Sequence, residues 1–179
     1  MTHTFQVDIP HMNPITLSAL EAFPLHLEAH YSAIPSAFKH WAPPSWDGVP
    51  SEPFTAVEQI CHVRDTEIEG YHVRFRRTLQ EMNPTLASID GETLANENSY
   101  ATSNSDAVFA AFREARMKTI AIIAGLTSEQ LDRKAELDGY GRLSLRSLVH
   151  YLCSHDQQHL AGLQWLLGKI EASRIDHVK

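Results

Sequence analysis

The chain has 179 residues and a formal net charge of −7, from 22 acidic and 15 basic side chains. Nucleic-acid binding needs a basic surface, so we expect none, and no apolar run is long enough to cross a membrane. Hydrophobic residues make up 43% of the chain, which is typical of a globular protein in water. We expect a single domain over residues 1–179, with its core over about residues 17–170.

The N-terminus and the cysteines indicate a compartment. Residues 1–8 contain no basic stretch followed by an apolar one, so a signal peptide is not expected. Cys61 and Cys153 are too few for a disulfide framework and suit a reducing environment. We therefore predict a cytoplasmic protein.

The first half of the chain predicts two long helices. One covers residues 17–41, where Pro24 and Pro35 are expected to start, kink or break it. A long loop follows over residues 42–53. The second helix runs from Thr55, an N-cap with Glu58 three residues on, to about residue 79. Its apolar stripe consists of Val57, Ile60, Cys61, Ile68, Tyr71, Phe75 and Leu79.

The second half predicts two more long helices. Residues 83–104 are expected to be irregular, because they are rich in Asn and Ser and contain Pro84. The third helix begins near Ser105 and ends near Gly125, and residues 127–132 add a short helical turn. After a turn-rich link over residues 136–143, Ser144 caps a last helix that continues to about Ile170. Strand patterns are nearly absent, so an all-α bundle is predicted.

Two histidines in the last helix carry the strongest chemical signal. His155 and His159 lie one helical turn apart, within or beside a stripe that contains Leu148, Leu152 and Leu163. Imidazoles on an apolar face need partners for their nitrogens. A divalent metal would satisfy both, and so would hydrogen bonds to carbonyls or carboxylates. For an isolated pair of this kind the second alternative is the commoner, so a third donor is needed.

His62 in the second helix is the leading candidate for that donor. It lies away from the apolar stripe, near Glu58, Asp65 and Glu69. Such a placement favours a solvated face. However, a middle helix of a bundle touches two neighbours, and its second face can line a polar cleft. The periodicity leaves both alternatives open.

Three segments together resemble the DinB-like superfamily, over roughly residues 24–167. They are His62-x-x-Asp65, His155-Asp-x-x-His159 and the Gly-x-Leu-Ser-Leu run at residues 141–145. Further support comes from Phe112-x-x-x-Arg116 and from Asp90-Gly91 with Asn98. One departure is Phe54, where the family often has Trp. The resemblance implies a four-helix bundle with an up-down-down-up arrangement that binds one divalent metal ion.

The resemblance also implies a set of site residues. The ligands would be His62, His155 and His159, which leaves at least one position for water or substrate, as in catalytic sites. Zinc and nickel both suit imidazole. Asp156 could orient a ligand or pair with Arg116, Asp65 could orient His62, and Arg116 could anchor a substrate carboxylate or form a structural ion pair.

Other histidines and motifs fit a site less well. His26 and His30 are also one turn apart, but two prolines interrupt their helix. His150 is expected on the surface. His72 could reach the cleft, but no feature of the sequence requires it there. Cys61 and Cys153 are expected to be structural thiols. The paired Glu-x-x-His motifs of di-iron bundles are missing, as are HExxH, paired CxxC, Walker and Rossmann motifs.

Two classes of function follow from the resemblance. The first is a metal-dependent enzyme acting on a small molecule. It would be a thiol-dependent S-transferase, in which a low-molecular-weight thiol cosubstrate attacks an electrophile, or else a hydrolase that uses metal-bound water. The second is a metal-binding stress-response protein without turnover. An open metal position facing a pocket would favour the enzyme, and a position blocked by protein would favour the second class. A homodimer is also expected by resemblance.

Overall fold

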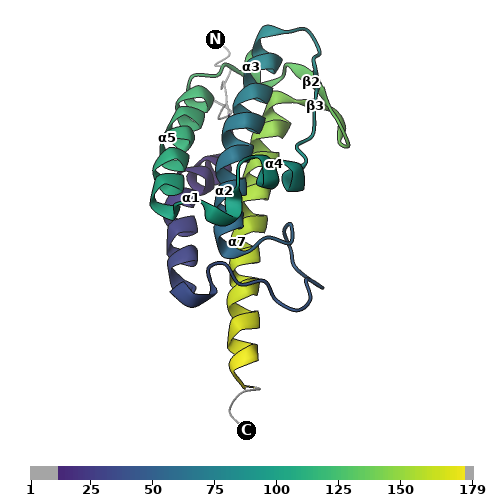
Figure 1. Ribbon diagram of the computed structural model, residues 1–179. Coiled ribbons are helices and arrows are strands. Elements are labelled where there is room, and N and C mark those ends of the chain that lie inside the picture. Colours follow the sequence, from purple (N-terminus) through teal and green to yellow (C-terminus); the bar gives the residue numbers. More distant parts are fainter. Residues whose placement is uncertain (1–11, 176–179) are drawn as a thin grey trace, which may run out of the picture.

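Four long helical segments lie side by side in the computed structural model, which describes residues 12–175 (Figure 1). The first is α1 (Pro14–Ala33), and the last is α7 (Leu145–Ile175). The second consists of α2 (Ala56–Asp65), the segment η2 (Thr66–Tyr71) and α3 (His72–Gln80), and the third is α5 (Ser105–Ala124). The predicted all-α four-helix bundle is confirmed.

The order of the helices around the bundle is α1, α5, α2 and α7. Helices α1 and α2 each contact both α5 and α7. In Figure 1, α1 and α7 run downward, whereas α2–α3 and α5 run upward. The arrangement is therefore the up-down-down-up topology that the sequence resemblance implied. The end of α7 extends below the other three helices.

Pro24 lies inside α1 and neither starts nor breaks it, which are two of the three effects expected of this residue. A proline lacks the N–H that would bond the carbonyl four residues earlier. Here that carbonyl belongs to Leu20, and it accepts a hydrogen bond of 3.1 Å from Nη1 of Arg116 on α5. Pro35 breaks the helix, as predicted. The residue before it, Ile34, is extended with ψ of 124°, so α1 ends at Ala33 and not near residue 41.

The second helical segment is a single run from residue 56 to residue 80, and its start is the predicted one. Thr55 and Glu58 form the expected capping box. In the middle, η2 adopts π-helical hydrogen bonding. A π turn holds more residues than an α turn and shifts the phase of the apolar stripe. Consequently Ile68, predicted on the inner face, is exposed, and Glu67 is buried instead.

The third and fourth helices begin as predicted. Asn104 caps α5 through a 3.0 Å bond to the amide of Ala107. The short helix α6 (Ser128–Leu131) confirms the expected turn after α5. Ser144 accepts a bond of 3.1 Å from the amide of Ser147 at the start of α7. Helix α7 continues to Ile175, five residues beyond the predicted end.

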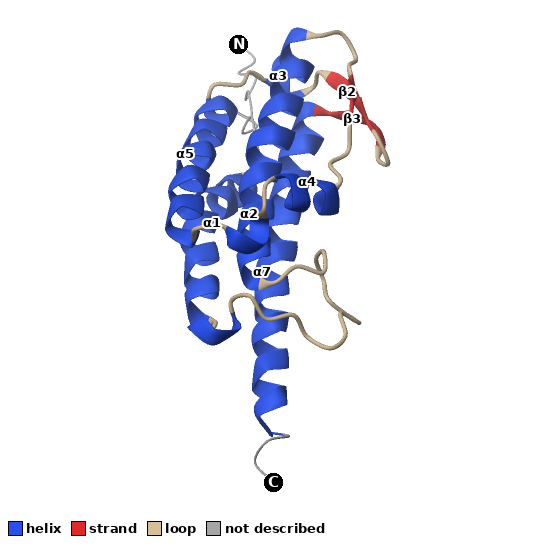
Figure 2. Cartoon of the chain, in the orientation of Figure 1, coloured by secondary structure: helices blue, strands red, loops and turns tan. Residues whose placement is uncertain are grey.

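Two connections that were predicted to be irregular contain regular structure (Figure 2). Strands β1 (Thr85–Leu86), β2 (Lys134–Leu137) and β3 (Gly141–Ser144) form a sheet in the order β1-β2-β3. The first pair is parallel and the second antiparallel. A short helix, α4 (Gly91–Glu97), and a 3-10 turn, η3 (Tyr100–Thr102), follow β1. These elements lie along one side of the bundle, beside α2 and α3.

The interior has two apolar clusters with a polar layer between them. One cluster includes Phe23, Ile60, Phe112 and Leu163, and the other includes Leu20, Phe75, Leu145 and Leu152. On α5, on α7 and on the segment from α2 to α3, the polar layer lies between the residues of one cluster and those of the other. Its buried members on α2, η2, α5 and α7 are His62, Glu67, Arg116, Asp156 and His159.

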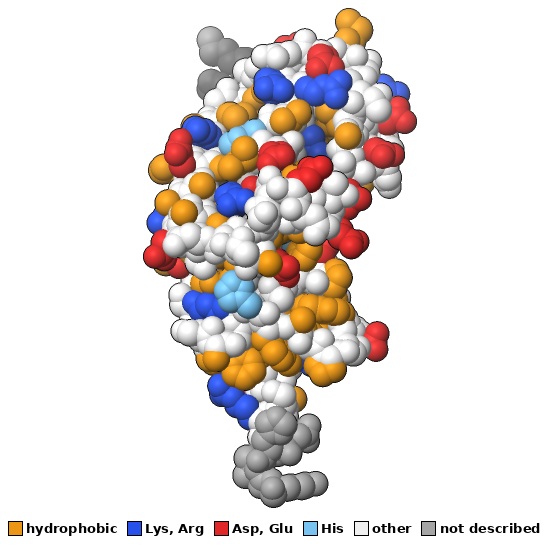
Figure 3. All heavy atoms as spheres, viewed as in Figure 1, with side chains coloured by type: hydrophobic (Ala, Val, Ile, Leu, Met, Phe, Trp, Pro, Cys, Tyr) orange, Lys and Arg blue, Asp and Glu red, His pale blue; other side chains and the backbone are white. Residues whose placement is uncertain are grey.

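Charges on the surface are mixed. On the described part of the face in Figure 3, Lys and Arg side chains lie among Asp and Glu side chains and do not form a continuous basic stripe. Between residues 12 and 175, no helix has both the length and the apolar character needed to cross a membrane.

Candidate metal centre

Three imidazoles meet in the polar layer. Helix α2 supplies His62, and one face of α7 supplies His155 and His159. Nε2 of His155 lies 3.3 Å from Nε2 of His62 and 3.1 Å from Nε2 of His159. The structure therefore brings together the three histidines that the sequence singled out, from two segments about ninety residues apart.

A fourth donor, Glu52, completes the cluster and was not predicted. Its Oε1 lies 3.5 Å from Nε2 of His62, and its Oε2 lies 3.4 Å from Nε2 of His159. Ligand atoms of all four residues lie within 4.8 Å of one another. Glu52 follows a loop rich in proline, where no periodicity shows which way a side chain points. Only its position a few residues before the second helix could have suggested it.

The spacing of these atoms fits a small cation. Ligands about 2.0–2.1 Å from a tetrahedral Zn²⁺ are separated from one another by about 3.3–3.4 Å. The four separations given above run from 3.1 to 3.5 Å. Three imidazole nitrogens and a carboxylate oxygen are also donors that first-row divalent metals accept. The residues present thus fit one divalent ion.

All three imidazoles favour the neutral form that binds metal. Burial, followed by the nearby His62 and Arg116, lowers the pKa of His155 to about 3. Burial also lowers the pKa of His62, against the opposing pull of Glu52, and that of His159. Because metal ligation needs an unprotonated nitrogen, these shifts keep the cluster ready for a cation at neutral pH.

Gln59, on α2 three residues before His62, sets the orientation of His159. Its Oε1 can only accept, so Nδ1 of His159 is the donor and the lone pair of Nε2 faces the cluster. The amide nitrogen of Gln59 donates to Ser51 Oγ at 2.8 Å and to the carbonyl of Glu52 at 3.2 Å. One buried amide therefore positions both a histidine and the loop that carries Glu52.

The loop with Glu52 lies directly on α7 because that helix has a glycine there. A Cβ at Gly162 would collide with Oγ of Ser51. On the other side of the cluster, a Cβ at Gly91 would lie 3.0 Å from Cε1 of His62. The start of α4 therefore packs tightly on the His62 ring, and Nδ1 of that ring is buried without a hydrogen-bond partner among the described residues.

Arg116 belongs to a separate buried network rather than to the cluster. It forms two bonds of 2.9 Å to Glu67, and bonds of 2.7 and 3.0 Å to Asp156. Burial raises the pKa of Asp156 to about 7, although the Arg116 guanidinium opposes the shift. Arg116 and Asp156 thus form the structural ion pair that was one of the alternatives considered for them. Glu67 was not singled out, because the π turn moves it inward.

Asp65 also contacts other partners than a histidine. It accepts bonds of 2.6 and 2.8 Å from Arg64 and one of 2.9 Å from Asn98. Burial tends to raise the pKa of Asp65, but these donors lower it overall. Asn98 at the end of α4 thus ties the α4 region to α2, and Asp90 caps the start of α4. The role expected for Asp65, orienting His62, remains a prediction.

The other histidines lie outside the cluster. His72 contacts the carbonyl of Ala115 at 3.1 Å and Thr119 on α5, so it faces away from α7. His150 is exposed and lies 3.1 Å from Oγ1 of Thr16. His26 is exposed, and His30 bonds the carbonyl of His26. Cys61 is buried, and burial raises its pKa, as expected for a structural thiol.

A cavity of about 270 Å³ opens beside the cluster. Glu52, His62 and His155 form one end of it. The remainder is lined by residues of η2, α3, the β1–α4 connection, the β2–β3 hairpin and α7, among them Tyr71, Arg74, Ser88, Tyr140, Tyr151, Ser154 and Gln158. The cluster is therefore accessible from a space large enough for a small molecule.

Fold and site together define a helical bundle with a three-histidine centre between its helices. A sequence profile of the DinB superfamily matches residues 19–163, which is most of the chain. The chain belongs to the DinB superfamily. No curated protein sequence matches it significantly.

A solved structure shows the same fold. YfiT from Bacillus subtilis superposes with a TM-score of 0.73 and 19% identity, covering 88% of this chain and 86% of that one. It is described as "a probable metal-dependent hydrolase with an unusual four-helix bundle topology". At this identity the likeness establishes the fold of the present chain.

Proposed function

We propose that the protein is a metal-dependent hydrolase of small molecules, with His62, His155 and His159 as ligands of one divalent ion. The observation that supports this most is the convergence of three neutral imidazole nitrogens at 3.1–3.3 Å beside an open cavity. A divalent ion bound there would lower the pKa of a coordinated water or thiol toward neutrality. The description of YfiT as a metal-dependent hydrolase is consistent with the proposal.

With the three histidines as ligands, Glu52, the fourth residue of the cluster, can act as the general base instead of as a ligand. Its carboxylate faces the three nitrogens on the cavity side, and its side chain keeps 42% of its exposure. There it can accept the proton of an attacking water and pass it to the leaving group. Gln59 holds both the base and His159 in place through its hydrogen bonds. Exchange of the products for a new water molecule through the cavity then restores the starting state.

A thiol-dependent S-transferase is the second candidate. The same carboxylate can take the proton of a thiol, and the cavity continues past the cluster to polar groups on α7, Ser154 and Gln158, where a cosubstrate fits. We prefer the hydrolase because the cluster includes a carboxylate that can act as a base, and water needs a base more than a thiol does. Thiols lose their proton near pH 8.5, whereas water does so far higher.

The test compares two reactions in the purified, metal-reconstituted protein. One is hydrolysis of a p-nitrophenyl ester, and the other is conjugation of cysteine to 1-chloro-2,4-dinitrobenzene. We expect ester hydrolysis that a chelator abolishes and added metal restores. The His155→Ala variant should be inactive, and His150→Ala, an exposed residue on the same helix, should be fully active. Conjugation without hydrolysis would select the transferase, and absence of both would leave a metal-binding protein without turnover.

A further inference from the structure

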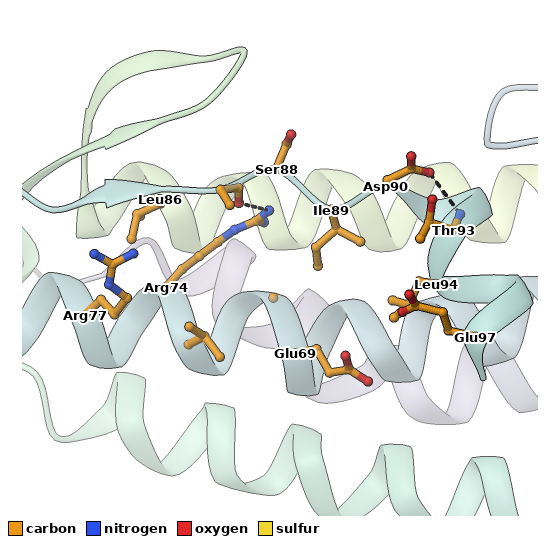
Figure 4. A pocket seen from close by; sticks show the side chains of 13 residues that line it. Glu69, Arg74, Arg77, Leu86, Ser88, Ile89, Asp90, Thr93, Leu94 and Glu97 are labelled. Carbon is orange, nitrogen blue, oxygen red and sulfur yellow. Dashed lines mark hydrogen bonds between the residues drawn. The ribbon is translucent and has the colours of Figure 1, made fainter.

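Arg74 is a buried cation in the wall of the cavity that contains the histidine cluster. It is 9% exposed and projects from α3 toward the segment between β1 and α4 (Figure 4). Its Nη2 donates a 3.1 Å bond to the carbonyl of Ala87, and its guanidinium carbon lies 5.0 Å from the centre of the Tyr71 ring. One carbonyl and one aromatic ring thus fix the direction of the side chain.

No carboxylate among residues 12–175 lies within ion-pairing distance of Arg74. The neighbouring Arg77 pairs with Glu81 at 2.7 Å, and the more deeply buried Arg116 pairs with two carboxylates. Nε of Arg74 is buried without a hydrogen-bond partner in the described part of the chain. Burial lowers the pKa of Arg74, which expresses the cost of an uncompensated charge. A buried cation without a counter-ion is costly, so its retention calls for an anion from outside the chain.

The position of Arg74 relates it to the candidate metal centre. The same cavity of about 270 Å³ is lined by Arg74 and by Glu52, His62 and His155. A second cavity of about 330 Å³ shares Arg74, Ser88 and Ile89 with the first cavity. No histidine lines this second cavity. Figure 4 shows the Arg74 side chain crossing from α3 toward the segment between β1 and α4, with Ile89 beside it. Arg74 therefore borders a space that has a histidine cluster at another wall.

Two tyrosines define the mouth of the cavity. The rings of Tyr140, on the β2–β3 hairpin, and Tyr151, on α7, lie 5.0 Å apart, and the two residues are 62% and 39% exposed. Exposed aromatic rings beside a pocket provide contact area for a flat or apolar ligand body. The lining thus combines one buried cation, an aromatic rim and the histidine cluster.

We propose that Arg74 binds a carboxylate of the substrate, and that the substrate is a small organic acid with a flat or apolar body. The guanidinium presents a planar fork that matches a carboxylate bidentately. The acid's body then lies against the tyrosines, and its reacting group lies toward Glu52 and the histidines. The orientation toward the reacting end rests on the proposed function. The anion site itself does not.

The test is calorimetric titration of benzoate and of its neutral analogue benzamide into the zinc-reconstituted and the zinc-free protein. We expect benzoate to bind at least about 10-fold more tightly than benzamide, with or without zinc. In Arg74→Gln the affinity for benzoate should fall about 10- to 100-fold, to the level of benzamide. Arg76→Gln, which removes an exposed charge two residues away on the same helix, should bind benzoate as the wild type does.

Several results would overturn the anion site. They are equal binding of benzoate and benzamide by the wild type, or unchanged benzoate binding in Arg74→Gln. Loss of benzoate binding on removal of zinc, in the wild type and Arg74→Gln alike, would assign the anion to the metal instead. If Arg74→Gln does not fold, the wild-type comparison and Arg74→Lys decide, because a lysine keeps the charge but loses the fork. Arg74-dependent binding without ester hydrolysis would leave the anion site standing while the proposed hydrolase fails.

Discussion

Nδ1 of His159 donates a hydrogen bond to Oε1 of Gln59 across the interface between α7 and α2. The amide nitrogen of the same Gln59 binds the backbone of the loop that carries Glu52. This side chain is fully buried and lies in the first turn of its helix. It therefore connects two of the four residues of the cluster, His159 and Glu52, without belonging to the cluster itself.

Replacing Gln59 should weaken metal binding without removing the site. In Gln59→Leu the His159 ring loses the acceptor that fixes its tautomer, so we expect zinc affinity to fall about 10- to 100-fold. Competition with a chromophoric chelator measures this. Gln80→Leu, at the exposed end of α3, serves as the control and should keep the wild-type affinity. Unchanged affinity in Gln59→Leu would mean that the hydrogen bond does not position the ligand.

The Glu52→Gln variant distinguishes between two roles of Glu52, a general base and a metal ligand. If Glu52 acts as a general base, the variant retains one zinc per chain but loses turnover by about 10²- to 10⁴-fold. Zinc content and ester hydrolysis are measured on the same sample. Glu92→Gln, in the first turn of α4, is the matched control and should behave as the wild type. Loss of zinc from Glu52→Gln would instead identify the carboxylate as a fourth ligand.

Arg116 is expected to be essential for stability. Arg116→Met would leave Glu67 and Asp156 buried without their cation, at a cost of about 3–5 kcal/mol in the free energy of unfolding. Arg113→Met on the same helix removes an exposed pair with Glu28 and should cost about 1 kcal/mol or less. Urea denaturation of both variants checks this. Equal stabilities would show that the buried network contributes little.

The metal-free protein should lose stability in acid because of its histidines. Their folded pKa values are lowered, so stabilisation is complete above the unfolded value near 6.5 and is lost as the pH falls toward 3. Asp156, raised to about 7, acts oppositely between its unfolded and folded values. Near pH 5 we therefore expect a net uptake of protons on unfolding, because three imidazoles outweigh one carboxyl group.

Urea denaturation between pH 4 and pH 7 measures that proton uptake. His155→Gln should reduce the slope of stability against pH, and His26→Gln, an exposed residue on α1, should not. A free energy of unfolding that stays constant or rises as the pH falls from 6.5 would contradict the buried, neutral imidazoles.

The sequence predicted what depends on local chemistry. The capping box at Thr55 and Glu58, the start of α5 and the cap at Ser144 are formed by residues a few positions apart, so their patterns are readable. The pairing of His155 with His159 follows from helical spacing alone. Its convergence with His62 was expected only through the family resemblance, since the wheel placed His62 on a polar face.

The features missed from the sequence depend on tertiary contacts. Strand β2 has four residues, too few for a distinct alternation, and it is stabilised by pairing with β1 and β3. The π turn in η2 exchanges the expected positions of Glu67 and Ile68. Pro24 is tolerated because Arg116, on another helix, satisfies the carbonyl of Leu20. No local sequence pattern predicts these contacts or the position of the Glu52 side chain.

The metal content of the reconstituted protein tests the central claim most directly. Elemental analysis after zinc loading and gel filtration should give one ion per chain for the wild type. It should give little or none for His62→Ala, His155→Ala and His159→Ala. His72→Ala, whose ring contacts α5 instead, should retain one ion. A full equivalent of zinc in all three cluster variants, or none in the wild type, would contradict a metal centre at these histidines.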